Sequence, residues 1–96
     1  MRRAISLVTA MVAAFMMSAG TASAATGVLY VGDEDYHDPE GCYVVILESG
    51  ERPHVYNNTD EPVEIYSNLG CNGTPARVLQ PREGGQLRAS VSLWVD

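Results

Sequence analysis

The chain has 96 residues and carries twelve acidic residues against six arginines, without a single lysine, so its formal net charge at pH 7 is −6. Such a charge opposes contact with phosphate backbones and with anionic lipid, and it excludes nucleic-acid binding. We see neither a linker nor a second domain in so short a chain.

Residues 1–24 have the pattern of a secretory signal peptide. Arg2 and Arg3 form a positive end, an apolar run follows from Ala4 to Met17, and Ala22-Ser23-Ala24 is a small-x-small cleavage site. The alternative is a membrane anchor, but a spanning helix needs about 20 predominantly apolar residues and this run is shorter. Paired arginines also occur in twin-arginine signals, but the Phe-Leu-Lys-like context of those signals is absent and a basic pair is the normal start of any signal peptide, so we predict general secretion. We therefore predict cleavage after Ala24 and release of a free extracellular protein without membrane contact.

Residues 25–96 are then a single small secreted domain, expected to be a monomer. Without the two signal arginines, four arginines face twelve acidic residues, a formal charge of −8. A domain of this size buries only about 60% of its unfolded surface, so a covalent cross-link is expected. Cys42 and Cys71 are its only cysteines and allow one internal disulfide in an oxidising compartment. A pair of reactive thiols is the alternative, but the chain lacks Cys-x-x-Cys spacing.

Short apolar runs separated by Gly, Pro and Asn predict an all-β domain. No helical spacing is sustained after Ala24, so we expect a small antiparallel sandwich or a Greek-key barrel with one disulfide. The predicted strands are 28–31, 42–47, 54–56, 63–66, 76–79 and 87–95, and the predicted loops or turns are 32–41, 48–53, 57–62, 68–75 and 80–86.

Two of these strands carry specific expectations. The segment 42–47 is continuously apolar, β-branched and aromatic, which favours a strand buried on both faces at the centre of the sheet. In 87–95, side chains alternate with period two. One face is predicted to carry Ala89, Val91, Leu93 and Val95, and the other Ser90, Ser92 and Trp94.

The last third of the chain resembles one Greek-key motif of the βγ-crystallin superfamily, which also occurs in small secreted actinobacterial proteins. The resemblance lies in Val63-Glu64-Ile65-Tyr66, six intervening residues, Gly73, a short strand ending at Leu79, and the closing segment Ser90-Val91-Ser92-Leu93-Trp94-Val95. It implies that Gly73 is a structural glycine beneath an aromatic side chain, in a conformation barred to bulky residues. It also implies that Ser90 or Ser92 is the serine of the family motif.

The resemblance does not extend to the family's calcium site or to the first half of the chain. Calcium-binding members carry two adjacent Asn or Asp residues shortly before the closing serines, where this chain has Leu87-Arg88-Ala89. The spacing that separates Tyr66 from Gly73 leads from Tyr30 to His37 instead of to a glycine.

The acidic segment 33–40 is the candidate site with the most chemical character. Carboxylates at alternate positions are how calcium loops begin, so the candidate metal ligands are Asp33, Asp35, His37 and Asp38. The EF-hand pattern fails, because Asp38 stands where glycine is needed and Val44 where the closing glutamate is needed. A single imidazole among hard oxygens does not make a zinc site. We therefore expect a solvated loop without metal or other cofactor.

The chain offers little material for catalysis. Nucleophilic catalysis needs a nucleophile, a base and an orienting group, and only His37, His54 and scattered serines are present, without a Gly-x-Ser-x-Gly turn. The first hypothesis is a secreted, non-catalytic interaction or inhibitor-like module that meets an extracellular protein partner through a loop such as 33–40 or 67–75. The second is a calcium-binding structural protein of crystallin type, and an enzyme is the third.

Overall fold

The computed structural model describes residues 24–96, so the predicted signal peptide lies outside the described residues except for Ala24. This part of the chain contains eight β-strands and no helix, which confirms the predicted all-β class. It accordingly holds no helix long and apolar enough to cross a membrane. The strands are β1 (Gly27–Val31), β2 (Glu34–His37), β3 (Gly41–Val45), β4 (His54–Thr59), β5 (Val63–Tyr66), β6 (Arg77–Leu79), β7 (Gly84–Gln86) and β8 (Val91–Val95).

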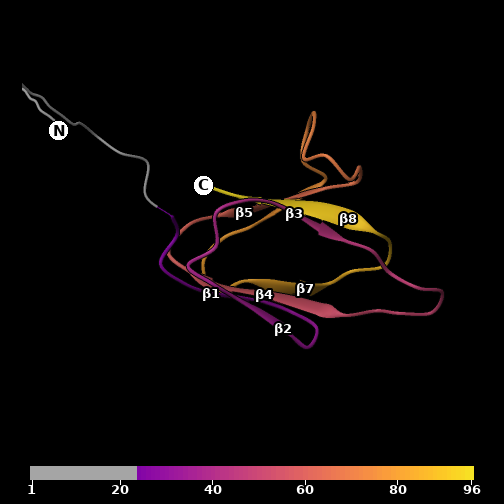
Figure 1. The fold of residues 1–96 in the computed structure, drawn as a ribbon, viewed down its shortest axis with the longest axis horizontal. Helices are drawn as coiled ribbons and strands as arrows, with labels where there is room; N and C mark the ends of the chain where they lie inside the picture. Colours follow the sequence, from indigo (N-terminus) through magenta and orange to yellow (C-terminus); the bar gives the residue numbers. More distant parts are fainter. Residues whose placement is uncertain (1–23) are drawn as a thin grey trace, which may run out of the picture.

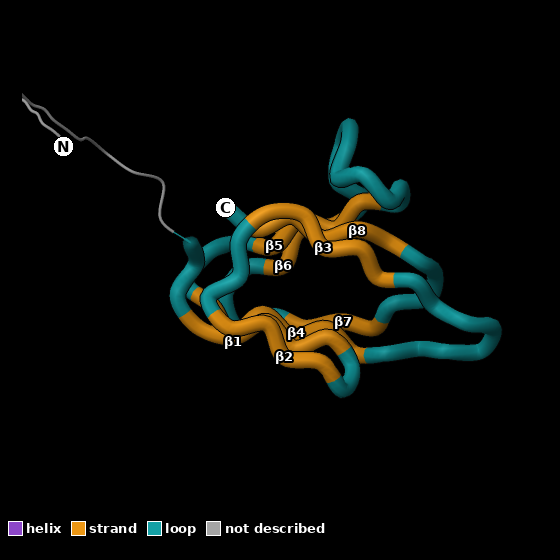
Figure 2. Tube along the Cα trace, viewed as in Figure 1, coloured by secondary structure: helices purple, strands orange, loops and turns teal. Residues whose placement is uncertain are grey.

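Two four-stranded antiparallel sheets pack face to face as a sandwich (Figures 1 and 2). Sheet A has the order β2-β1-β4-β7 and sheet B the order β3-β8-β5-β6. The first half of the chain contributes β1, β2 and β4 to sheet A and β3 to sheet B. The second half contributes β5, β6 and β8 to sheet B and β7 to sheet A. Neither half therefore completes a sheet without the other, and the domain is expected to fold as one cooperative unit.

The core lies between the sheets and follows the period-two pattern of the strands. Inward-facing residues of both sheets are fully buried, whereas their sequence neighbours face outward. Burial of each large aliphatic side chain contributes about 1.5–3 kcal/mol. Core side chains no more than 1% exposed are Ala25, Leu29, Val55, Val63, Leu79, Leu93 and Val95.

The segment 42–47 does not lie at the centre of a sheet, so that prediction was wrong. β3 is an edge strand of sheet B, and its side chains alternate between half-buried and exposed. Val44 remains 51% exposed and Ile46, just after the strand, 62% exposed. Tyr43, Val45 and Leu47 pack against the core from the other face. A continuous apolar run does not reveal whether both of its faces are covered, and here only one is.

Three segments predicted as loops or turns contain strands. Residues 34–37 form β2, residues 57–59 extend β4, and residues 84–86 form β7. Asp, Asn and Gly have low β-propensity, but pairing with a neighbouring strand outweighs that preference. The final strand begins only at Val91, so the prediction that Ala89 belongs to it was wrong, and Ala89 lies exposed in the preceding loop. The prediction that Val91, Leu93 and Val95 share one buried face is confirmed.

Cys42 and Cys71 form the predicted disulfide, with their Cα atoms 6.2 Å apart. The bond joins edge strand β3 to the loop between β5 and β6, which projects from the outer face of sheet B (Figure 2). The same loop is held by Ser92 of β8, whose buried hydroxyl accepts a hydrogen bond from the Cys71 N–H at 2.8 Å and donates one to the Asn68 carbonyl at 2.6 Å. A disulfide indicates an oxidising environment for the folded protein.

Candidate functional site

The four candidate metal ligands of the acidic segment lie in different places. Asp33 occupies the turn between β1 and β2, whereas Asp35 and His37 are exposed on β2 and face away from the core. The Asp38 carboxylate accepts a hydrogen bond from the Gly27 N–H at 3.0 Å, and its own N–H donates to the Gly27 carbonyl at 2.7 Å. Within residues 24–96, no three His, Cys, Asp or Glu side chains lie close enough together to hold a metal ion.

Gly73 has the backbone conformation expected of a structural glycine. Its φ of 81° lies in the left-handed region that favours glycine. No heavy atom lies within 4 Å of the position that a Cβ would take, so no aromatic side chain covers that side. Gly73 is therefore explained by its φ and not by crowding.

The two histidines are separated from the interior. His37 on β2 and His54 on β4 are exposed and sit next to inward-facing core residues in their strands. In the described part of the chain, neither imidazole has a hydrogen-bond partner that could serve as a nucleophile or an orienting group.

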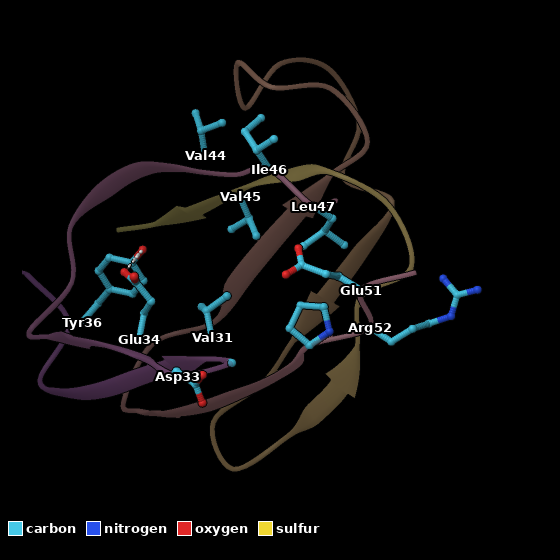
Figure 3. Close-up of a pocket in the computed structure, with 12 residues that line it drawn as sticks. Val31, Asp33, Glu34, Tyr36, Val44, Val45, Ile46, Leu47, Glu51 and Arg52 are labelled. Atoms are coloured by element: carbon cyan, nitrogen blue, oxygen red, sulfur yellow. Dashed lines mark hydrogen bonds between the residues drawn. The ribbon is translucent and has the colours of Figure 1, made fainter. Parts of the chain in front are cut away.

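An open cleft of about 650 Å³ lies between the sheets where the β1–β2 turn faces β3 and the β3–β4 connection (Figure 3). Val31 of sheet A points toward Val45 and Leu47 of the opposite wall, and these three side chains form an apolar floor in one part of the cleft (Figure 3). Carboxylates line its rim, and they belong to Asp33, Glu34 and Glu51. The cleft thus combines an apolar floor with an acidic rim.

Arg52 is the cationic residue among those that line the cleft. Its guanidinium Nη1 lies 3.5 Å from the Arg88 carbonyl oxygen, and the side chain points out of the cleft (Figure 3). The Glu51 carboxylate accepts a hydrogen bond from the Glu48 N–H at 2.8 Å, and the Glu34 carboxylate accepts one from the Tyr36 hydroxyl at 3.4 Å.

Two tyrosines close one end of the cleft. Tyr36 of β2 and Tyr43 of β3 bring their ring centroids to 4.7 Å, which joins the edges of the two sheets. The Tyr43 hydroxyl accepts a hydrogen bond from the Glu40 N–H at 2.9 Å. Burial raises the pKa of the Tyr36 phenol above its ordinary value, and the nearby Glu34 carboxylate raises it further. Both effects disfavour the phenolate and keep Tyr36 neutral beside the acidic rim.

The opposite side of the sandwich is covered instead of open. Arg77 of β6 donates a hydrogen bond to the Gly84 carbonyl of β7 at 3.2 Å, so its guanidinium connects the two sheet edges there. A Cβ at Gly85 would collide with this guanidinium. The Arg77 guanidinium thus spans the sheet edges on the side opposite to the cleft.

Most of the cleft is not evident from the sequence. Asp33 was predicted as part of an acidic loop, but Val45, Leu47 and Glu51, which come from a different part of the chain, were given no binding role. A segment that alternates between apolar and polar residues shows which of its side chains face inward. Residues 42–47 are apolar on both faces, so the sequence does not show that Val45 and Leu47 face inward.

Comparisons of this chain with protein-family models, with curated proteins and with solved structures find no match.

Proposed function

We propose that residues 25–96 form a secreted, non-catalytic interaction or inhibitor-like module that binds an extracellular protein partner at the cleft. The observation that carries this proposal is the apolar floor and acidic rim of an open cleft on one side of the sandwich. Protein interfaces commonly combine an apolar centre with a polar rim. The signal-peptide pattern and the Cys42–Cys71 disulfide support action outside the cell.

The proposal of a non-catalytic role is supported by where the titratable groups lie. The cleft is lined by carboxylates and an arginine, while His37 and His54 are exposed elsewhere. A catalytic base has to lie within hydrogen-bond reach of the proton that it abstracts. Histidines outside the cleft do not meet that condition for a ligand bound within it.

We further propose that the domain is a pair of Greek-key motifs of βγ-crystallin type. The strand order supports this, because in each half the fourth strand lies beside the first: β4 beside β1 and β8 beside β5. The hydrogen bonds from Ser92 to the β5–β6 loop support its assignment as the serine of the family motif. The first half has this strand arrangement without the motif's spacing.

The second candidate function is a calcium-binding structural protein of crystallin type, for which the strand order supports the fold and not a calcium site. Its test is thermal melting of the oxidised mature protein with calcium chloride and with chelator. Calcium that binds only the folded state raises the melting temperature. The interaction module predicts equal melting temperatures, and a rise that saturates with calcium would favour the second candidate.

The interaction function is tested by capture of a partner from culture supernatant of the producing organism on immobilised mature protein. Glu34→Lys reverses a charge on the rim of the cleft, and Asp35→Lys makes the same change on the next residue, which faces outward. We expect the wild type and D35K to retain the same partner, and E34K to lose it. Equal retention by all three variants would contradict binding at the cleft.

A further inference from the structure

The four edge strands of the sandwich differ in how they resist pairing with another chain. Natural sheet edges are protected by charged side chains, by shortness or by covering structure. β2 is Glu-Asp-Tyr-His and carries charge, whereas β6 and β7 have three residues each and are bridged by Arg77. β3 has five residues, Gly-Cys-Tyr-Val-Val, without a charge or a proline. Of the edges in the described structure, β3 is thus the least protected.

The edge of β3 continues as extended apolar chain beyond the strand. The Leu47 N–H donates a 2.8 Å hydrogen bond to the Ser90 hydroxyl, which keeps Ile46 and Leu47 alongside the segment that leads into β8. In an antiparallel ladder, alternate residues direct their N–H and C=O groups away from the partner strand. β8 is the only strand that pairs with β3 in residues 24–96, so those outward groups meet no backbone partner there.

We propose that an extended segment of the partner protein adds to the free edge of β3 as a fifth strand of sheet B. This inference rests on the interaction function proposed above and specifies how the partner binds. Main-chain hydrogen bonds supply affinity in strand addition, and alternate side chains supply specificity. One set of side chains of the added strand faces the cleft beside Val45 and Leu47, and the other lies beside Val44 and Ile46 on the outer face.

The negative charge around β3 favours a partner segment with basic residues. Glu40 and Glu48 flank the edge at its two ends, and Asp33 and Glu34 lie across the cleft on the β1–β2 turn and β2. The added strand therefore carries Lys or Arg on its cleft-facing side and apolar residues on its outer side. A second copy of this chain does not meet this requirement, because its own β3 has no basic residue and both copies carry a formal charge of −8.

The test uses the oxidised mature protein and a defined probe, a ten-residue peptide in which Lys and Val alternate. A second peptide carries N-methyl groups on alternate amides, which blocks main-chain pairing along one edge without a change of charge. Binding is measured by calorimetry, and amide shifts of isotope-labelled protein locate the contact. We expect the plain peptide to shift amides of residues 41–47 and the methylated peptide to bind at least tenfold more weakly.

Val44→Lys adds a protecting charge to the β3 edge, and Val78→Lys is its matched control. Val78 is an exposed valine on β6, the other edge strand of the same sheet, and its side chain faces the same outer side. We expect V44K to weaken peptide binding at least tenfold and V78K to leave it unchanged. Thermal melting confirms that each variant is folded, and the methylated peptide tests the same point on unaltered protein.

Other outcomes overturn strand addition and leave the interaction function to be judged by the capture experiment. Equal binding of the two peptides, together with loss of binding in E34K, would mean that the cleft attracts cations without main-chain pairing. Failure of the plain peptide to bind would overturn the proposed partner chemistry. A dimer whose contact shifts map to residues 41–47 would assign the edge to a second copy instead.

Discussion

The backbone N–H of Cys71 donates a 2.8 Å hydrogen bond to the buried hydroxyl of Ser92, so the loop that carries one half of the disulfide is also fastened to β8. The Ser92→Ala variant leaves the Cys71 N–H and the Asn68 carbonyl without this partner. We expect a loss of about 1–3 kcal/mol in the free energy of unfolding, measured in urea. Ser67→Ala, at an exposed position nearby, is the control. If both variants changed the free energy of unfolding equally, the hydrogen bonds of Ser92 would contribute nothing to stability.

Removal of the disulfide should destabilise the domain strongly. In the loop-entropy model, a cross-link between residues 29 apart in sequence stabilises the fold by about 3.6 kcal/mol. We expect the double variant Cys42→Ser/Cys71→Ser to lose about this amount in urea unfolding at neutral pH. Rapid alkylation of both thiols in the native, unreduced protein would contradict the bond itself.

Gly27 and Gly50 provide a matched pair for separating backbone strain from crowding. Both have positive φ, 123° and 88°, but a Cβ at Gly27 would collide with the Asn58 carbonyl of β4, whereas a Cβ at Gly50 would meet open space. We expect Gly50→Ala to cost about 1 kcal/mol from strain and Gly27→Ala at least about 2 kcal/mol more, because β1 has to move away from β4. Similar melting temperatures for the two variants would contradict the close approach.

Tyr36 should make stability decline at alkaline pH. Its pKa is raised by burial and by Glu34, so the folded state holds the phenolic proton more tightly than the unfolded state. This contribution is fully present below about pH 10 and is lost as the pH rises through the folded-state pKa. We expect Tyr36→Phe to reduce the fall in unfolding free energy above about pH 10. An unchanged decline would assign it to other groups.

The secreted protein should begin at Ala25. Ala25 is 1% exposed and its N–H donates to the Pro39 carbonyl at 3.3 Å, while the Thr26 N–H donates to the Asp60 carboxylate at 2.8 Å. Cleavage after Ala24 preserves these contacts of the first strand. We expect the intact mass of secreted protein to correspond to residues 25–96 with one disulfide. A chain that starts after Gly27 would lack these contacts and would contradict both the cleavage site and their importance.

Local sequence patterns were sufficient where a segment has one apolar face. The bounds of β5 at Val63–Tyr66 and the buried face of Val91, Leu93 and Val95 follow from period-two alternation, which depends on the strand alone. The disulfide also followed from the sequence, because two cysteines in a domain predicted to be exported allow a single internal pairing.

The tertiary structure decided those features that depend on contacts with neighbouring strands. Residues 34–37, of which two are acidic, and glycines 84–85 form strands because β1 and β4 offer them a backbone partner, which no local propensity records. The same holds for β3, whose position at an edge leaves Val44 exposed, and for the cleft, which unites residues 31–36 with residues 44–53. The sequence alone determined the strands that have one apolar face and the cross-link, because those are properties of local pattern and composition. Only the packing of two sheets decided which strand edge stays free and which carboxylates surround it.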